Sequence, residues 1–233
     1  MKRKLLVEIA AVALLMALLV CALWFFWGKD PVPEGQPTPP PQGGGWVNLL
    51  DEERAGAWKN VTDDMDIFEI KDGILHIFGR TVYPLRYVGY TAEDFGDFEL
   101  HLEFKVARNA NSGVFLRAQH GDPLARGFEV QVLEDYGKKP TKHRSGAIYD
   151  VVNPMFNMSR PANEWNSYDI TVQGDEVVVF MNGWRVVHTD FSKMTVPLGK
   201  FDTPYAELPR QGMLMLQDHG GEVWYRNIVV RKL

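Results

Sequence analysis

The sequence predicts an all-β protein whose strands form a sandwich of two antiparallel sheets, and three observations support this prediction. From Trp46 onward, apolar and polar residues alternate in short runs with a period near two. Turn dipeptides such as Asp-Gly and Asn-Gly separate these runs, as hairpins require. Roughly eleven such runs occur in about 190 residues, with helical periodicity nearly absent, which is typical of a sandwich.

The first 28 residues precede the sandwich and differ from it in composition. Residues 2–4 are basic, and residues 5–27 are almost entirely apolar, long enough to cross a bilayer core of about 30 Å. We expect residues 1–28 to form one transmembrane helix that stays uncleaved, with a removed signal peptide as the alternative. The basic start predicts a cytoplasmic N-terminus, so the globular domain would lie on the periplasmic or extracellular side of the cell membrane.

A Pro/Gly-rich segment follows this helix. Residues 31–45 read PVPEGQPTPPPQGGG, a composition that cannot bury apolar surface. We therefore expect residues 29–45 to be an extended, partly stiff linker that holds the domain away from the membrane. The folded domain is expected to comprise residues 46–233.

The strands of this domain are assigned from the alternation pattern. In chain order they are expected at residues 67–70, 74–78, 98–106, 113–118, 128–133, 147–151, 165–173, 176–181, 184–190, 212–217 and 223–232. Tight hairpin turns are expected at Asp72-Gly73, Gly174-Asp175 and Asn182-Gly183, because each dipeptide separates two strands.

Composition excludes some classes of function. The net charge of −5 and the absence of a basic stripe argue against a nucleic-acid partner. Cys21 is the only cysteine and lies in the apolar N-terminal run, so no internal disulfide is possible. The sequence shows no pair of His or Cys residues with zinc-ligand spacing, and no structural zinc is expected.

Alternation also assigns the two faces of the strands. In the run FEVQVLED, Phe128, Val130 and Val132 would point into the core, which leaves Glu129 and Gln131 on the opposite face.

The same rule applies to three other runs. Val114, Leu116, Ile148, Leu214 and Leu216 would point inward. The outward residues are then Phe115, Arg117, Tyr149, Met213, Met215 and Gln217, with His219 in the following turn. If these strands are neighbours, one sheet presents a guanidinium, a carboxylate, amides and a phenol together, a mixture suited to binding sugars.

The motifs NSGVFLR, GFEVQVLED, SGAIYD, EWNSYDI, MNGWRV and LQDHGGEVWYRNIVV, with the opening GWVNLLDEERAGAW, resemble in order the 3-keto-disaccharide hydrolase family. The resemblance runs from about Trp46 to Leu233. It implies a concanavalin A-like jelly-roll sandwich that acts on a carbohydrate, a glycoside already oxidised to a ketone at C3. Asp150 stands where the family often has a small residue.

Such a substrate makes specific chemical demands. A carbonyl at C3 acidifies the hydrogen on C2, so a general base can remove it. The resulting enolate expels the substituent on C1, and water then adds, which gives net hydrolysis. The enolate oxygen needs a cation or strong hydrogen-bond donors beside it.

The predicted roles follow from these demands. Glu129 or His219 would be the base, and Arg117 would bind the C3 oxygen. Asp218 would orient His219 or bind a metal; no cofactor is assigned, and a divalent metal ion is left open. The residues assigned to substrate binding are Gln131, Tyr149, Gln217, Asp218 and Asn111.

Other interpretations remain open at this point. Glu129 and Arg117 could form a cross-strand salt bridge on an exposed sheet, and residues 218–221 could simply form a turn. Residues 138–144 are expected to form a solvated basic loop, with a lid over the site as the alternative. The domain could also be a non-catalytic carbohydrate-binding, lectin-like module on a membrane stalk, or a structural domain of the cell envelope.

Overall fold

The computed structural model describes residues 35–80, 82–119, 121, 126–199 and 201–233. The residues from Gly35 to Leu233 form one compact unit. The predicted transmembrane helix lies outside the described residues. Within the described part of the chain, no helix has the length and apolar character needed to cross a membrane.

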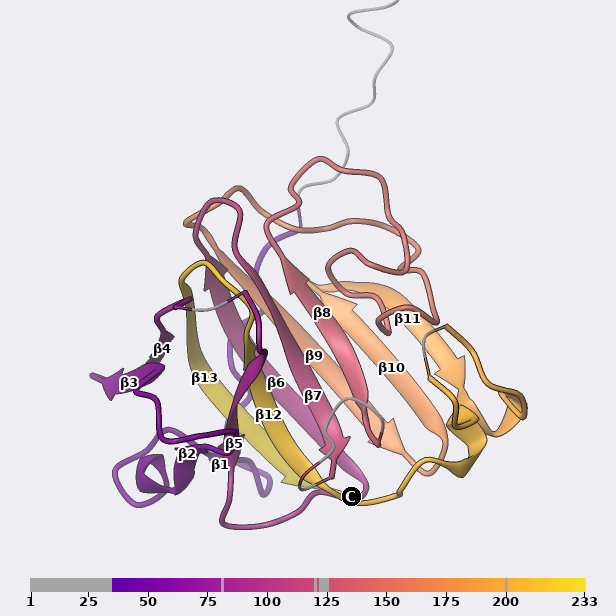
Figure 1. Ribbon diagram of the computed structural model, residues 1–233, viewed down its shortest axis with the longest axis horizontal. Coiled ribbons are helices and arrows are strands. Elements are labelled where there is room, and N and C mark those ends of the chain that lie inside the picture. The colour runs from indigo at the N-terminus through magenta and orange to yellow at the C-terminus, as the bar shows by residue number, and fades with distance from the viewer. Residues whose placement is uncertain (1–34, 81, 120, 122–125, 200) are drawn as a thin grey trace, which may run out of the picture. The chain divides into compact units, whose positions relative to one another are not determined.

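The larger of the two antiparallel sheets has eight strands (Figure 1). Their order is β11 (Trp184–Asp190), β10 (Glu176–Met181), β9 (Trp165–Gln173), β6 (Phe98–Val106), β13 (Val223–Lys232), β4 (Ile74–Ile77) and β3 (Phe68–Lys71), and β1 (Val47–Asn48) also pairs with β13.

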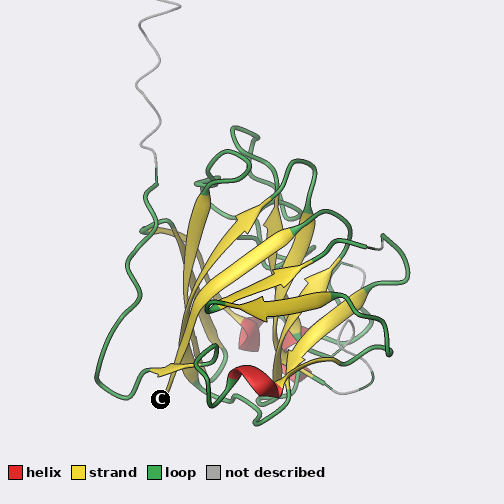
Figure 2. Ribbon diagram, turned by 90° about the vertical axis from the view of Figure 1, so that its left-hand side faces the viewer, coloured by secondary structure: helices red, strands yellow, loops and turns green. Residues whose placement is uncertain are grey.

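The smaller sheet has five strands, and it carries Glu129, Gln131 and Gln217. Its order is β2 (Trp58–Asn60), β5 (Arg86–Tyr90), β12 (Met213–Asp218), β7 (Asn111–Ala118) and β8 (Phe128–Leu133). The helices among the described residues are three short 3-10 turns, η1 (Ala55–Ala57), η2 (Phe191–Lys193) and η3 (Tyr205–Glu207). Figure 2 shows how little of the domain is helical.

The predicted two-sheet β-sandwich is confirmed, with local differences. The three predicted hairpins are present; at Asn182-Gly183, for example, both residues have positive φ, of 51° and 81°. Residues 147–151 were predicted as a strand but form turns, in which only Ile148 makes isolated bridges, to Val130 and Val152. Three strands, β1, β2 and β5, were not predicted.

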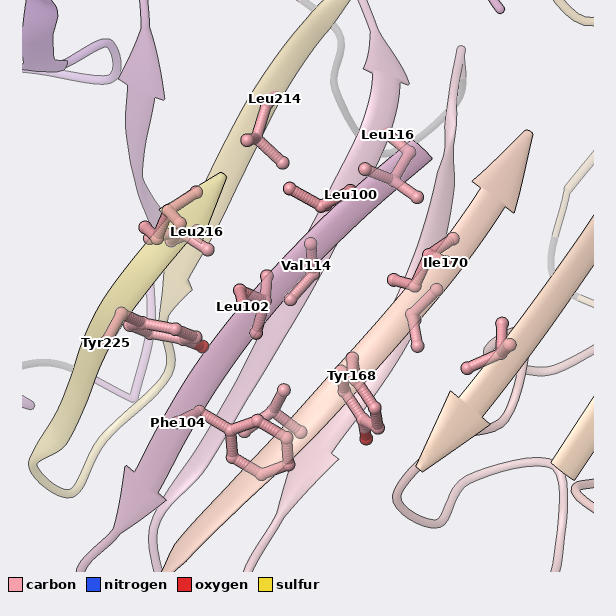
Figure 3. Packing of buried hydrophobic residues seen from close by; sticks show 14 of the residues in the cluster. Leu100, Leu102, Phe104, Val114, Leu116, Tyr168, Ile170, Leu214, Leu216 and Tyr225 are labelled. Atoms are coloured by element: carbon pink, nitrogen blue, oxygen red, sulfur yellow. The ribbon is translucent and has the colours of Figure 1, made fainter. Parts of the chain in front are cut away.

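The core lies between the two sheets, as alternation predicts (Figure 3). Side chains from β6, β9 and β13 meet side chains from β7 and β12 there, and all of them are removed from water. The labelled members are Leu100, Leu102, Phe104, Val114, Leu116, Tyr168, Ile170, Leu214, Leu216 and Tyr225. Phe128, Val130 and Val132 of β8 belong to the same core, so the predicted inward face of β8 is confirmed.

The predicted linker is not a free spacer over its whole length, because the part that begins at Gly35 packs on the eight-stranded sheet. The Thr38 backbone N–H donates to Ser167 Oγ at 2.9 Å, and Thr38 Oγ1 donates to Asp169 Oδ2 at 2.6 Å. Arg160 donates to the Gly35 carbonyl oxygen at 3.2 Å. These bonds move the start of the folded unit from the predicted Trp46 to Gly35.

A buried carboxylate fixes the loop between β8 and β9. Asp135 is 1% exposed and accepts hydrogen bonds from the backbone N–H and the Oγ of Ser145, both at 2.9 Å. Burial raises the pKa of Asp135, and the bonds from Ser145 oppose that rise. Because Ser145 lies four residues before Tyr149, this contact positions the segment that borders the outer face of β8.

Thr38→Val is expected to lower the free energy of unfolding by about 1 kcal/mol, because both hydrogen bonds of the Thr38 hydroxyl are lost. Urea denaturation of the full-length chain in detergent would measure the change. Thr171→Val, on the same face of β9 as Asp169, is the control and should leave the midpoint unchanged. Equal midpoints for the two variants would show that the linker is not docked.

Asp135→Ala should cost about 1–3 kcal/mol of stability, because the buried N–H and hydroxyl of Ser145 lose their acceptor. Thermal unfolding followed by circular dichroism would show a melting temperature several degrees lower. Asp64→Ala, at an exposed position, is the control and should leave the melting temperature unchanged. An unchanged melting temperature for Asp135→Ala would refute the anchoring role.

Candidate functional site

The outer face of the five-stranded sheet, which we call the floor, brings together residues from four strands. One row runs from Glu129 to Phe115, then to Met215 and Gly89, each opposite the next in the strand pairing. The neighbouring row contains Gln131 opposite Gly113, and Gln217 opposite Tyr87. Strand alternation therefore places Glu129, Gln131 and Gln217 on one surface, as the sequence predicted.

The floor is buried, although it faces away from the core. Glu129 is 6% exposed and Gln131 and Gln217 are each 3% exposed. Tyr87, Phe115, Ala118, Met213 and Met215 form a second apolar cluster on this face, against which Val61 and Leu85 pack. Burying a carboxylate and two amides among such side chains is costly unless they are well partnered. The floor is therefore the candidate functional site.

Gly113 makes the position of the Glu129 carboxylate possible. A Cβ atom at Gly113 would lie 2.2 Å from Oε1 of Glu129 and 2.9 Å from its Cγ. The Glu129 side chain therefore lies directly over the backbone of β7. The absence of a side chain at Gly113 therefore makes room for the Glu129 carboxylate, and Gly113 does not form a β-bulge.

Two tyrosines lie near this carboxylate. The Tyr149 backbone N–H donates to the Glu129 carbonyl oxygen at 2.9 Å, so the two residues are neighbours. Burial raises the pKa of Tyr149, and the negative charges of Glu129 and Asp150 add to that effect. Burial raises the pKa of Tyr87 to about 12, with the Gln217 side chain opposing and the Glu129 charge adding. Both phenols therefore stay protonated at neutral pH and can donate hydrogen bonds.

Gln131 ties the floor to the segment that ends at Tyr149. Its backbone N–H donates to the Ala147 carbonyl oxygen at 3.1 Å, and its carbonyl oxygen accepts from the Gly146 N–H at 3.0 Å. Its side-chain Oε1 accepts from the Val132 N–H at 2.9 Å. The position of Tyr149 beside Glu129 therefore depends on the backbone of β8.

His219 lies at one end of the floor and is fixed by Asn111. The Asn111 amide Nδ2 and the His219 Nδ1 are 2.8 Å apart. Because an amide nitrogen can only donate, Nδ1 is the acceptor, and the proton of the neutral ring is on Nε2. The contact with Asn111 therefore engages Nδ1 of His219, whereas the carboxylate of Glu129 lies over the backbone of β7.

The predicted place of Arg117 on the floor is wrong. Its guanidinium donates to the carbonyl oxygens of Gly96 and Gly174, at 3.0 and 2.8 Å, and to Asp97 Oδ1 at 2.9 Å. These partners lie next to the start of β6 and the end of β9 in the eight-stranded sheet, on the core side. The cross-strand salt bridge with Glu129, which was the alternative, is excluded by the same contacts.

A β-bulge explains why alternation fails at Arg117. Phe115 pairs with Met215, whereas Ala118 pairs with Met213, so two residues of β7 lie opposite one residue of β12. Arg117 has a φ of 50°, which reverses the direction of its side chain. Ala118 then returns to the floor.

Asp218 also lies off the floor, contrary to the predicted substrate-binding set. It is 1% exposed, shares its face of β12 with Leu216, and pairs with Arg86 across the ladder. Burial raises the pKa of Asp218, against the effect of the Gly220 and Arg80 backbone N–H groups. Among the residues that the structure describes, no three His, Cys, Asp or Glu side chains converge to form a metal site.

Three residues near the floor were not assigned to the site from sequence. Tyr87 was missed because β5 was not predicted, although its segment RYVGY has the Tyr and Val residues that favour a strand. His143 and Asp150 form a pair beside Tyr149, with His143 Nε2 2.9 Å from Asp150 Oδ1. Lys142 Nζ lies 2.7 Å from the same oxygen. No local pattern in the sequence identifies this pair.

Two proteins that are similar to this chain have names that refer to carbohydrate hydrolysis. A protein of Bacteroides thetaiotaomicron named 3-keto-disaccharide hydrolase is 27% identical over 81% of this chain and 79% of its own length. The crystal structure of a candidate glycosyl hydrolase from Parabacteroides distasonis is also 27% identical, covers 81% of this chain and 99% of its own, and superposes with a TM-score of 0.69.

A more distant structure defines the fold. A carbohydrate binding module from Bacillus subtilis covers 76% of this chain and 96% of its own, with a TM-score of 0.53 and 10% identity. At that identity the likeness concerns the fold alone, which is the concanavalin A-like, galectin-like sandwich.

The family match covers residues 45–231, which includes all of the floor and every strand of both sheets apart from the last residue of β13, Lys232. The chain therefore belongs to the family of 3-keto-alpha-glucoside-1,2-lyase-like domains.

Proposed function

We propose that this protein cleaves glycosides that carry a ketone at C3, with Glu129 as the general base. The family and the named activity of the Bacteroides relative support this substrate class. The observation that carries the proposal is the Glu129 carboxylate, which is 6% exposed, lies over Gly113 and borders Tyr149 on a floor that otherwise holds amides and apolar groups.

The reaction needs one base and no second carboxylate. Glu129 removes the hydrogen on C2, whose acidity comes from the C3 carbonyl. The electron pair of the C2–H bond forms the enolate, the C1–O bond then breaks, and water adds to the unsaturated sugar. The Glu129 carboxylate is 6% exposed and is held over Gly113, so its position is fixed for accepting that proton.

The enolate oxygen requires donors other than Arg117, which lies on the core side of the sheet. The phenols of Tyr87 and Tyr149 meet this requirement, because burial raises the pKa of each and keeps it protonated. The Tyr87 hydroxyl is buried beside the Gln217 side chain, and its proton can be donated to a ligand on the floor. Gln131 and Gln217 position the sugar hydroxyl groups.

The place of action is part of the same proposal. The apolar run at residues 5–27, preceded by three basic residues, supports a single membrane anchor with a cytoplasmic N-terminus. The hydrolase domain would then meet its substrates on the periplasmic or extracellular side of the membrane.

Glu129→Gln should reduce the rate of cleavage of a 3-keto-disaccharide by roughly 10²–10⁴-fold, because the amide cannot accept the C2 proton. Sugar release by the full-length chain in detergent would measure this rate, and isothermal titration calorimetry would show that binding is retained. Glu69→Gln, on exposed β3, is the matched control and should keep full activity. Ligand binding by the native chain without any turnover would identify a carbohydrate-binding module instead.

Gly113→Ala tests the position of the carboxylate without removing it. The new methyl group would displace the Glu129 side chain, so cleavage should slow by about 10-fold or more. The melting temperature should fall by only a few degrees, because the displaced group is the end of a flexible side chain. Gly56→Ala, where an added Cβ meets nothing within 4 Å, should change neither quantity. Unchanged turnover in Gly113→Ala would argue against Glu129 as the base.

A further inference from the structure

The proposed elimination also needs a group that gives a proton to the departing oxygen. When the C1–O bond breaks, its electron pair goes to the departing oxygen, and a sugar alkoxide is a poor leaving group unless it receives a proton. The base cannot supply that proton in the same step, because it is taking one from C2. A second group that carries a proton must therefore lie beside Glu129.

The pair of His143 and Asp150 is connected to Glu129 through Tyr149. His143 precedes Tyr149 in the sequence, and Asp150 follows it directly. The ring centroids of His143 and Tyr149 are 5.1 Å apart. Tyr149 in turn bonds to the backbone of Glu129. The negative charges of both Glu129 and Asp150 raise the pKa of Tyr149, which places both carboxylates near one phenol.

Asp150 is held in a strained conformation to make this contact. Its φ is 63°, in the left-handed region that few residues other than glycine adopt, and its backbone N–H donates to the Lys142 carbonyl oxygen at 2.8 Å. Gly199 packs so closely that a Cβ there would lie 2.4 Å from Asp150 Oδ2. The Asp150 side chain is 13% exposed, so the carboxylate is fixed on both sides before any ligand binds.

The contact assigns the protons of the His143 ring. Nε2 lies 2.9 Å from Asp150 Oδ1, and a carboxylate only accepts, so Nε2 carries a proton and donates it to Asp150. When the ring is protonated, the second proton is on Nδ1. The side chain of His143 is 50% exposed, so the ring is accessible from solvent. Asp150 stabilises the charged ring and fixes its orientation.

We propose that His143 is the general acid of the reaction and that Asp150 is its positioning residue; this inference rests on the proposed function. As Glu129 takes the C2 proton and the C1–O bond breaks, the Nδ1 proton of the His143 imidazolium passes to the departing oxygen. The products of this step are an unsaturated keto sugar, a neutral alcohol and a neutral His143 that still donates from Nε2 to Asp150. Solvent then reprotonates Nδ1.

The test uses the full-length chain and two substrates. Both substrates contain the 3-keto-glucosyl group, and they differ in the leaving group. One releases a sugar, which needs a proton, and the other releases nitrophenol, which leaves readily as an anion. His143→Gln should lower kcat/KM for the disaccharide by roughly 100-fold and for the nitrophenyl glycoside by less than about 5-fold. Glu129→Gln should lower both, because C2 deprotonation is common to them.

Two further variants separate the positioning role from alternatives. Asp150→Asn, which tolerates the left-handed conformation, should show a smaller loss than His143→Gln but with the same dependence on the leaving group. Lys142→Met removes a further cation that contacts Asp150 and should not show that dependence. His188→Gln, an exposed histidine near Glu176 on the other sheet, is the matched control and should be fully active.

The outcomes are distinct. Equal losses on both substrates for His143→Gln, no loss on either, or the leaving-group dependence appearing with Lys142→Met would each overturn the assignment of His143 while leaving the proposed function in place. Failure of the unsubstituted chain to cleave either substrate would overturn the proposed function and this inference with it.

Discussion

The pairing of β7 with β8 is the constraint on which the rest of the site depends. Because Val130 and Val132 must enter the core, Glu129 is forced onto the opposite face, and the same register places Gly113 beside it. The carboxylate can then lie flat on the backbone of β7, where any other residue than glycine would exclude it. The packing of Val130 and Val132 in the core therefore fixes the face of β8 on which the Glu129 carboxylate lies.

The floor combines two properties that are usually separate. Its residues are as buried as a core, yet they include a carboxylate and two amides. The segment from Ser145 to Tyr149 closes one side of it and is held by the buried Asp135, while Val61 and Leu85 pack at the other side. Low solvent exposure strengthens electrostatic interactions with a ligand and excludes water from a reactive enolate. In the proposed reaction, the surrounding loops would therefore contribute to the environment of the substrate.

Arg117 shows how a residue suited to one role can serve another. Its three hydrogen bonds join β7 to the turns at the edge of the opposite sheet, where it is 3% exposed. A bulge is required for this, since regular alternation would have sent the guanidinium to the floor. The arginine therefore stabilises the contact between the sheets and makes no ion pair with Glu129. The segment at Thr38 likewise stabilises the eight-stranded sheet, through its hydrogen bonds to Ser167 and Asp169 of β9.

The sequence by itself determined the features that depend on neighbouring residues. The long strands, the three tight turns, the inward face of β8 and the presence of Glu129, Gln131 and Gln217 on one surface all follow from alternation and turn chemistry, and the ordered motifs identified the family. The tertiary structure alone decided the bulge at Arg117, the inclusion of β5 with Tyr87, the docking of Thr38 and the pairing of His143 with Asp150. These features depend on contacts between distant segments, for which the local sequence carries no periodic signal, because the energy that selects them comes from packing and hydrogen bonds formed only in the folded chain.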